Sequence, residues 1–140
     1  MSAIVLDASV VGAWYLRGQA TAGADAMLND APNLEFVVPH IFPTEVVSLL
    51  LKAERNGRIT ALRSREVLDD LGGYSLRTWD APTLLQVGSI LSLARNEGLS
   101  AYDALYLDLA AREGLVLATR DGALIQAAAR RSVPARDLRT

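Results

Sequence analysis

Four acidic residues occupy positions from which a carboxylate could do chemistry. Asp7 and Asp121 each follow an apolar run typical of a buried strand, while Glu45 and Asp103 lie in the expected first turns of two helices. Carboxylates gathered in one pocket repel one another and require a compensating cation. Oxygen ligands suit Mg²⁺ or Mn²⁺, which would activate water and stabilise the transition state of phosphodiester hydrolysis.

Two hydroxyl residues accompany these acids. Ser9 lies two residues after Asp7, and Thr119 lies two residues before Asp121, so each hydroxyl could orient a carboxylate or a water. Taken singly, every one of these residues has a simpler interpretation, because Asp and Ser are common helix N-caps and acids are common in first turns. Only their convergence at one edge of a sheet favours a catalytic site.

Other polar and aromatic residues are predicted to be structural. Asp108 lies five residues after Asp103, about 140° around the helix, and is expected to face solvent. His40 precedes a predicted helix in a turn and is expected to have a structural role. Trp14 and Tyr15 are expected to belong to the core rather than to a base-stacking surface.

The composition excludes several classes of site. The chain has no cysteine and one histidine among 140 residues, which excludes disulfides, zinc thiolate sites and sites with several histidines. Its 14 basic and 16 acidic residues are nearly balanced, unlike a polybasic nucleic-acid coat. The N-terminus lacks the basic region of a signal peptide, and no apolar run approaches about 18 residues, so we expect a cytoplasmic protein.

The elements that must position the acids alternate along the chain. Strands are predicted over 3–6, 35–38, 74–79, 115–119 and, weakly, 133–136. Helices are predicted over 7–17, 19–29, 45–56, 60–71, 82–96, 100–113 and 121–131. This alternation predicts an α/β fold in which helices cover both faces of a parallel sheet, with residues 1–140 forming a single domain. In such sheets, ligands bind beyond the carboxyl ends of the strands, where the strand order reverses.

Four other classes of protein with acidic or phosphate-binding sites do not fit. A phosphoacceptor receiver domain needs a lysine at a late strand end, but the single lysine, Lys52, falls in a predicted helix. A haloacid-dehalogenase-like phosphatase needs a second acid two residues after Asp7, where this chain has Ser9. The chain also lacks the glycine-rich motifs of dinucleotide-binding and P-loop proteins.

Four segments of the chain resemble the PIN-domain family, and within it the VapC-type toxins of bacterial toxin–antitoxin pairs. The segments are Ile4-Val5-Leu6-Asp7-Ala8-Ser9-Val10, then Val38-Pro39 followed by Glu45, then residues 99–110 around Asp103, and finally residues 115–121. The resemblance covers nearly the whole chain, and the order of the motifs matches that of the family.

The resemblance implies a fold, an activity and partners. The fold would be a PIN-like three-layer α/β/α arrangement with a central parallel sheet of four to five strands. The activity would be a Mg²⁺- or Mn²⁺-dependent endoribonuclease acting on structured RNA such as tRNA or rRNA. The protein would form a homodimer, and a VapB-type antitoxin would obstruct its active site.

The family's catalytic residues transfer onto this chain. The resemblance implies an acidic quartet that binds the metal directly or through water, namely Asp7, Glu45, Asp103 and Asp121, supported by Ser9 and Thr119. Glu45 would be a ligand or would orient the attacking water. One departure from the family is Ser48, at a position where many relatives have asparagine.

The sequence leaves the RNA-binding surface and the cellular role open. Residues 112–140 contain six arginines against three acids. Candidate phosphate contacts within this segment are Arg120, Arg130, Arg131 and Arg136, although a solvated helix face explains each of them equally well. Two alternatives to a toxin remain, a housekeeping PIN nuclease in RNA processing and a non-catalytic PIN interaction module.

Overall fold

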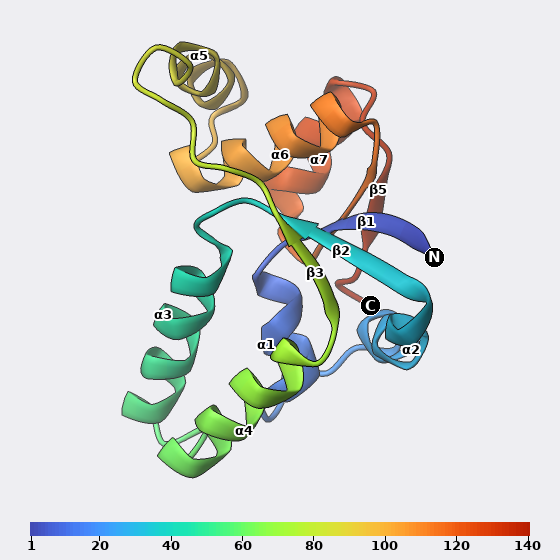
Figure 1. The fold of residues 1–140 in the computed structure, drawn as a ribbon, viewed down its shortest axis with the longest axis vertical. Coiled ribbons are helices and arrows are strands. Elements are labelled where there is room, and N and C mark those ends of the chain that lie inside the picture. The colour runs from blue at the N-terminus through green and yellow to red at the C-terminus, as the bar shows by residue number, and fades with distance from the viewer.

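A five-stranded, all-parallel sheet forms the centre of the computed structural model, which describes residues 1–140 (Figure 1). Its strands are β1 (Ser2–Leu6), β2 (Leu34–Val38), β3 (Ser75–Thr78), β4 (Val116–Thr119) and β5 (Ala135–Asp137). They lie in the order β3-β2-β1-β4-β5. The predicted α/β class and parallel sheet are confirmed, with five strands.

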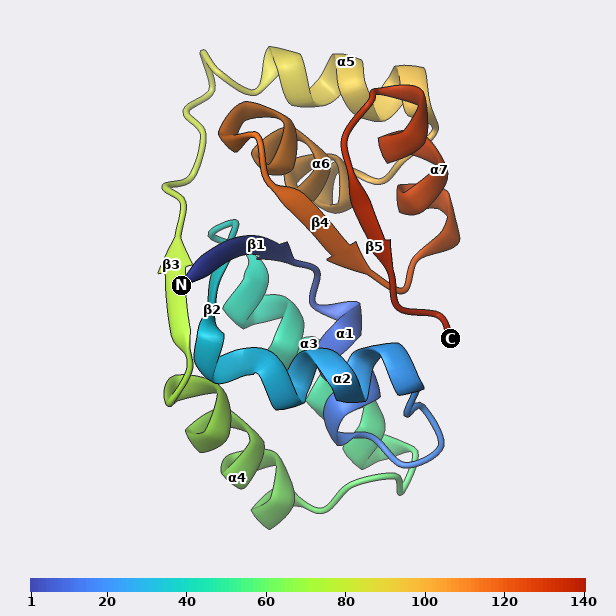
Figure 2. The ribbon, with the colours of Figure 1, turned by 90° about the vertical axis from the view of Figure 1, so that its right-hand side faces the viewer.

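Seven helices cover the two faces of this sheet. They are α1 (Ser9–Tyr15), α2 (Ala22–Asp30), α3 (Phe42–Arg55), α4 (Ala61–Gly72), α5 (Gly88–Glu97), α6 (Ala101–Glu113) and α7 (Gly122–Arg130). A short 3₁₀ turn, Ala31–Asn33, precedes β2. Figures 1 and 2 show α1 to α4 on one side of the sheet and α5 to α7 on the other, which makes three layers.

The central strands are apolar runs because both of their faces are covered. Ile4–Leu6 in β1 and Phe36–Val38 in β2 are buried. The strand predicted over 74–79 forms over Ser75–Thr78, and every residue of this edge strand is exposed. Because β3 is an edge strand, it has a neighbouring strand on one side only, which explains its exposure.

The strand order reverses beside β1. The chain passes from β1 to β2 and β3 on one side, and then returns to β4 and β5 on the other side. In the parallel pair of β1 and β4, Leu6 lies opposite Ala118. Asp7 and Thr119 therefore leave the sheet side by side, at the place where open parallel sheets bind ligands.

Three predicted helices begin two or more residues later than expected, and one of them, predicted over 19–29, begins at Ala22. The first begins at Ser9 rather than at Asp7, and its N-cap residue Ala8 makes no side-chain bond. The helix predicted over 82–96 begins only at Gly88. In the preceding segment Leu84 and Leu85 are 93% and 98% exposed, so no packing stabilises an earlier helical turn.

The ends of α5 and α6 show why glycine occupies them. Gly98 and Gly114 follow these helices with φ of +65°, the left-handed conformation that glycine adopts without steric cost. The position of α6 matters for function because it carries Asp103. None of the seven helices combines the length and the apolar character required to span a bilayer.

Candidate active site

Asp7 is the one buried charged residue of the chain, with 5% of its surface exposed. Its backbone N–H donates to the carbonyl of Ala118 at 3.0 Å, which holds it against the end of β4. Its Oδ2 accepts hydrogen bonds from the hydroxyls of Ser9 at 2.7 Å and Thr119 at 2.6 Å. Burial raises the pKa of Asp7, and these hydrogen bonds counter part of that rise.

The two hydroxyl residues belong to a wider network around Asp7. Thr119 is fully buried, and its Oγ1 also accepts a hydrogen bond from the backbone N–H of Asp121 at 3.0 Å. The Oγ of Ser9 accepts a hydrogen bond from the backbone N–H of Arg120 at 3.2 Å. Both hydroxyls therefore orient the Asp7 carboxylate while their own lone pairs are fixed by the loop after β4.

Asp121 caps α7, as its simpler interpretation suggested. Its Oδ1 accepts hydrogen bonds from the backbone N–H groups of Ala123 at 2.9 Å and Leu124 at 3.2 Å. Its charge nevertheless acts on the other acids, because it raises the pKa of both Asp7 and Asp103. Capping and participation in an acidic pocket are therefore compatible at this residue.

Glu45 is half-buried in the first turn of α3. Its Oε1 accepts a hydrogen bond from the hydroxyl of Tyr106 at 2.6 Å. Burial raises the pKa of Glu45, the Tyr106 hydrogen bond lowers it, and the charges of Asp7 and Asp103 raise it further. Glu45 thus senses acids from two other elements.

Tyr106 is not among the residues that the sequence predicts to be functional. Its side chain is fully buried, and its burial together with the bond to Glu45 raises the pKa of its hydroxyl, so it acts as a proton donor to the carboxylate. One signal was present in the sequence. Tyr106 lies three residues after Asp103, which places both on neighbouring parts of one helix face.

Asp103 has the most clearly perturbed carboxyl of the quartet. Ser100 caps α6, and its Oγ accepts a hydrogen bond from the backbone N–H of Asp103 at 3.1 Å. Burial, with the charges of Asp121 and Asp7, raises the pKa of Asp103 to about 6. Each predicted acid therefore interacts electrostatically with at least one other, as the convergence of strand ends predicted.

The donor set of this pocket fits a hard divalent cation. One oxygen in each of Asp7, Glu45 and Asp121 accepts a hydrogen bond from a side chain or from the backbone. The backbone N–H of Ser9 also bonds to the Asp7 carboxylate, and the Ser100 hydroxyl bonds to that of Asp103, and each bond lowers the pKa of its acid. No three His, Asp or Glu side chains are already arranged as a metal-binding cluster. Carboxylate oxygens are ligands of the type that Mg²⁺ and Mn²⁺ prefer.

The four arginines suggested as RNA contacts occupy different environments. The guanidinium of Arg120 donates to the carbonyl of Ser9 at 3.2 Å and to Oε1 of Gln19 at 3.0 Å. Arg130 and Arg131 both form ion pairs with Glu97, at 2.6 and 2.7 Å. The fourth, Arg136 in β5, is exposed and makes no ion pair.

The remaining side-chain predictions have mixed outcomes. Trp14 and Tyr15 pack against the core as expected, and Trp14 donates its indole N–H to the carbonyl of Ala24 at 2.8 Å. Asp108 is less exposed than predicted, because the Asp108 carboxylate, 20% exposed, pairs with Arg112 at 2.9 Å.

Comparison with known proteins supports the fold and the family. The model of the PIN domain matches residues 4–130. The chain matches none of the curated proteins with which it was compared. One similar solved structure is PAE2754 from Pyrobaculum aerophilum, at 25% identity over 90% of this chain and 84% of that chain, with a TM-score of 0.64.

Two further solved structures share the fold at lower identity. VapBC2 from Rickettsia felis, bound to a DNA fragment from their promoter, is 15% identical over 96% of this chain and 98% of that chain, with a TM-score of 0.68. FitAcB from Neisseria gonorrhoeae is 19% identical over 96% of each chain, with a TM-score of 0.58. With a family match that spans all four strand-end and helix-start acids, the chain belongs to the PIN-domain family.

Proposed function

We propose that this chain is a Mg²⁺- or Mn²⁺-dependent endoribonuclease and the toxin of a VapBC-type pair, which cleaves structured RNA such as tRNA or rRNA. The observation that carries this proposal is the buried carboxylate of Asp7, held by two hydroxyls beside three further acids. Such a cluster destabilises the folded chain unless a cation compensates it. A purely structural role gives no reason to retain that cost.

Each acid has a distinct part in the proposed reaction. Asp7, Asp103 and Asp121 would hold the metal, directly or through water. When bound, the ion activates a water and stabilises negative charge on the phosphate. Glu45 is either a further ligand or the residue that orients the attacking water, since the Tyr106 bond fixes its Oε1 and leaves Oε2 able to accept from water.

Phosphate contacts would come from the arginines near the pocket. Arg120 is adjacent to Asp121 and is already bonded to Ser9, so it is the best placed of the four candidates. Arg136 has a free guanidinium. Arg130 and Arg131 would contribute the exposed parts of guanidinium groups that also bind Glu97.

An antitoxin segment has a candidate surface on α3, the helix that carries Glu45. Val47 and Leu51 are 43% and 42% exposed and lie one turn apart on this helix. An apolar face of a partner segment would cover this strip, which lies about 120–160° around the helix from Glu45. The resemblance of the fold to VapBC2 and FitAcB supports a paired partner of this kind.

A homodimer also has a candidate contact surface. Leu84 and Leu85 are almost fully exposed, and Leu91 on the neighbouring helix α5 is 59% exposed. Adjacent exposed leucines of this kind are typical of surfaces that another chain covers. We propose that a second copy of this chain packs against them.

The decisive experiment is induced expression in a bacterial host with mapping of new RNA ends. The wild type should arrest growth and produce discrete new ends, and Asp7→Asn should do neither. Asp69→Asn, an exposed acid on α4, is the matched control and should behave as the wild type. In vitro, EDTA should abolish cleavage, and added Mg²⁺ or Mn²⁺ should restore it.

The alternatives give different outcomes in the same experiment. A housekeeping nuclease would cleave RNA but would not cause a growth arrest. Co-expression of a cognate antitoxin would then have no arrest to relieve. A non-catalytic interaction module would give the same RNA ends with the wild type and with Asp7→Asn. Cleavage that persists in EDTA would contradict the metal mechanism.

A further inference from the structure

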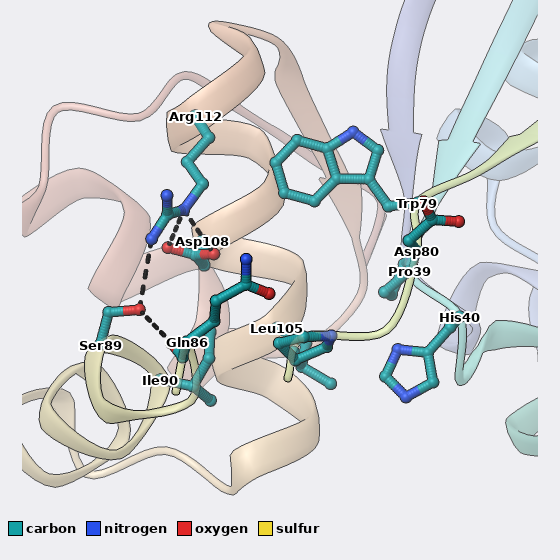
Figure 3. A pocket seen from close by; sticks show the side chains of 11 residues that line it. Pro39, His40, Trp79, Asp80, Gln86, Ser89, Ile90, Leu105, Asp108 and Arg112 are labelled. Atoms are coloured by element: carbon teal, nitrogen blue, oxygen red, sulfur yellow. Dashed lines mark hydrogen bonds and ion pairs between the residues drawn. The ribbon is translucent and has the colours of Figure 1, made fainter. Parts of the chain in front are cut away.

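A separate cavity of about 280 Å³ lies beside the acidic pocket (Figure 3). Its walls come from the end of β2, the segment after β3, the start of α5 and one face of α6. None of the four acids proposed to bind the metal lines it. Figure 3 shows Trp79 and His40 on one side of the cavity, with Ser89 and Arg112 on the other.

His40 connects this cavity to the proposed catalytic site. It lines the cavity, and it also lines a shallower hollow that contains Glu45 and Tyr102. A chain of nucleotides passing Glu45 could therefore place a neighbouring group in the cavity. The α6 helix also links the two sites, because it carries Asp103 and contributes Leu105 and Asp108 to the cavity wall.

The walls combine aromatic rings with polar side chains. The indole of Trp79 is held in place by its N–H, which donates to Oε1 of Glu113 at 2.6 Å. The imidazole of His40, the amide of Gln86 and the hydroxyl of Ser89 lie around the same space. Rings that stack and polar groups that bond to an edge are the features that proteins use to hold an unpaired nucleobase.

Some polar side chains around the cavity already have hydrogen-bond partners, and others remain free to bind a ligand. Both oxygens of Asp108 accept from Nε of Arg112, at 3.0 and 2.9 Å, so this pair is largely satisfied. Oε1 of Gln86 accepts from the backbone N–H of Thr83 at 3.0 Å, which leaves its NH₂ as a free donor. The Asp80 carboxylate has no partner and is a free acceptor. The free groups thus suit a planar ligand with both donors and acceptors on its edge.

The charges and the size of the cavity narrow the choice of ligand. Asp80 and Asp108 would repel a phosphate, and the guanidinium of Arg112 is already engaged with Asp108. The volume lies just below the range typical of drug-sized ligands, so it holds a single base rather than a base pair. A free carboxylate at Asp80 favours bases with an exocyclic amino group, which offers two N–H donors, over uracil, whose edge offers only N3–H.

We infer that this cavity receives one unpaired nucleobase of the RNA, next to the phosphate that is cleaved at the acidic pocket. The inference rests on the proposed ribonuclease function and adds a determinant of cleavage-site choice. An RNA would be cut where a flexible segment can turn one base outward into the cavity.

The test uses Trp79 as a reporter of base stacking. The full chain carries Trp14→Phe, so that Trp79 is its only tryptophan, and Asp7→Asn, so that RNA stays intact. Titration with single-stranded hexamers of A, C or U should quench its fluorescence in a saturable manner. Ser89→Phe, which fills the cavity, should raise the Kd about tenfold or more. This is the loss of affinity expected when one base no longer stacks.

Further variants make the result specific. Gln86→Ala should also weaken binding. This smaller substitution tests the cavity independently in case Ser89→Phe misfolds, and unfolding curves show whether each variant is folded. Asp80→Asn should weaken binding of the A and C hexamers more than that of the U hexamer. Asp69→Asn, on α4 and on the other side of the sheet from α5 and α6, should leave every Kd unchanged.

Several outcomes would overturn the inference. These are absence of quenching by any hexamer, or quenching that neither Ser89→Phe nor Gln86→Ala changes. Quenching by an antitoxin peptide but not by RNA would assign the cavity to a protein partner. Suppose that the protein with Asp7 intact cleaves RNA, and that the cavity variants cut at the same positions and bind with the same Kd. The proposal of a base-binding cavity is then wrong, while the proposed ribonuclease function stands. If that protein cleaves no RNA, the proposed function fails instead.

Discussion

At the scale of single residues, the acidic pocket is an assembly of carboxylates whose negative charges raise one another's pKa values. Asp7 has the most buried carboxylate, and Asp103 the one whose pKa is raised to about 6. Neutral donors orient two of the acids without supplying positive charge, since Ser9 and Thr119 donate to Asp7, and Tyr106 donates to Glu45. The missing positive charge is what a metal ion would provide.

The raised pKa of Asp103 predicts an unusual pH dependence of stability without metal. Between its ordinary value of 3.8 and about 6, the folded chain binds more protons at this residue than the unfolded chain does. The free energy of unfolding therefore falls as pH rises through this window. In EDTA at pH 7, Asp103→Asn should be more stable than the wild type, by about 1 kcal/mol once solvent screening is included.

Urea denaturation at pH 4 and pH 7 measures this difference. The advantage of Asp103→Asn should be small at pH 4, where Asp103 is protonated in the folded wild type. Asp69→Asn is the control and should show no such gain, because this acid is exposed on α4. Equal or lower stability of Asp103→Asn at pH 7 would contradict mutual repulsion in the pocket.

Tyr106 is predicted to control the pKa of Glu45. Its hydrogen bond lowers the pKa of Glu45, so Tyr106→Phe should raise that pKa further. If ionised Glu45 is needed for cleavage, the acidic limb of the pH–rate profile should move to higher pH. The rate at neutral pH should fall about tenfold, less than the roughly 100-fold or larger contribution of a positioned acid–base group itself, because Tyr106 acts only through Glu45.

A matched variant separates this effect from a general loss of stability. Tyr74→Phe also removes one hydroxyl contact, the 3.3 Å bond between Tyr74 and Tyr15, on the other side of the sheet. It should leave the pH profile unmoved. A profile that shifts equally in both variants would rule out a specific link between Tyr106 and Glu45.

At the scale of elements, the site depends on where helices begin and end. The carboxyl ends of β1 and β4 deliver Asp7 and Thr119 side by side, α3 and α6 present acids in their first turns, and Asp121 is the N-cap of α7. Helix N-termini favour negative charge, so each element supports its own carboxylate. The repulsion arises only when these elements are packed together.

The end of α6 offers a test at this scale. Gly114 has φ of +65°, and alanine there costs about 1 kcal/mol because of its Cβ in the left-handed region. Gly114→Ala should lower the free energy of unfolding by that amount without changing the acids directly. Gly88→Ala, at the start of α5 with open space around it and no positive φ, should cause no loss. Thermal or urea unfolding of both variants decides the matter, and equal stability would contradict the assigned strain.

At the scale of the whole molecule, charge and apolar surface are unevenly distributed. Outside the acidic quartet, the chain has 14 basic and 12 acidic residues, so a mildly basic body surrounds an acidic pocket. Such a body can approach RNA, while the pocket itself accepts a phosphate only with its cation. Exposed leucines gather separately, around the start of α5.

These leucines predict the oligomeric state. The double variant Leu84→Glu with Leu85→Glu should convert a dimer into a monomer, because it places charges in the proposed apolar contact. Light scattering during gel filtration measures the mass directly. Leu62→Glu, at another exposed leucine on α4, should keep the mass of the wild type. A wild-type chain that is monomeric at every concentration would contradict the proposed dimer.

Much of the fold could be predicted from the sequence because its signals are local. Apolar runs end at Asp7 and shortly before Asp121, and a proline and a capping serine mark the helices of Glu45 and Asp103. The helix predicted from residue 82 was placed too early, since its apolar residues have no surface to pack against. Helical propensity alone does not order a turn that lacks packing.

The sequence by itself determined the parallel α/β arrangement and the four acids, because periodicity and capping act within a few residues. Only the tertiary structure decided that Tyr106 bonds to Glu45, 61 positions away, and that Thr119 bonds to Asp7. It alone also formed the cavity between Trp79 and α6. These features join residues distant in the chain, and their contacts depend on how the helices pack on the sheet, which no local pattern encodes.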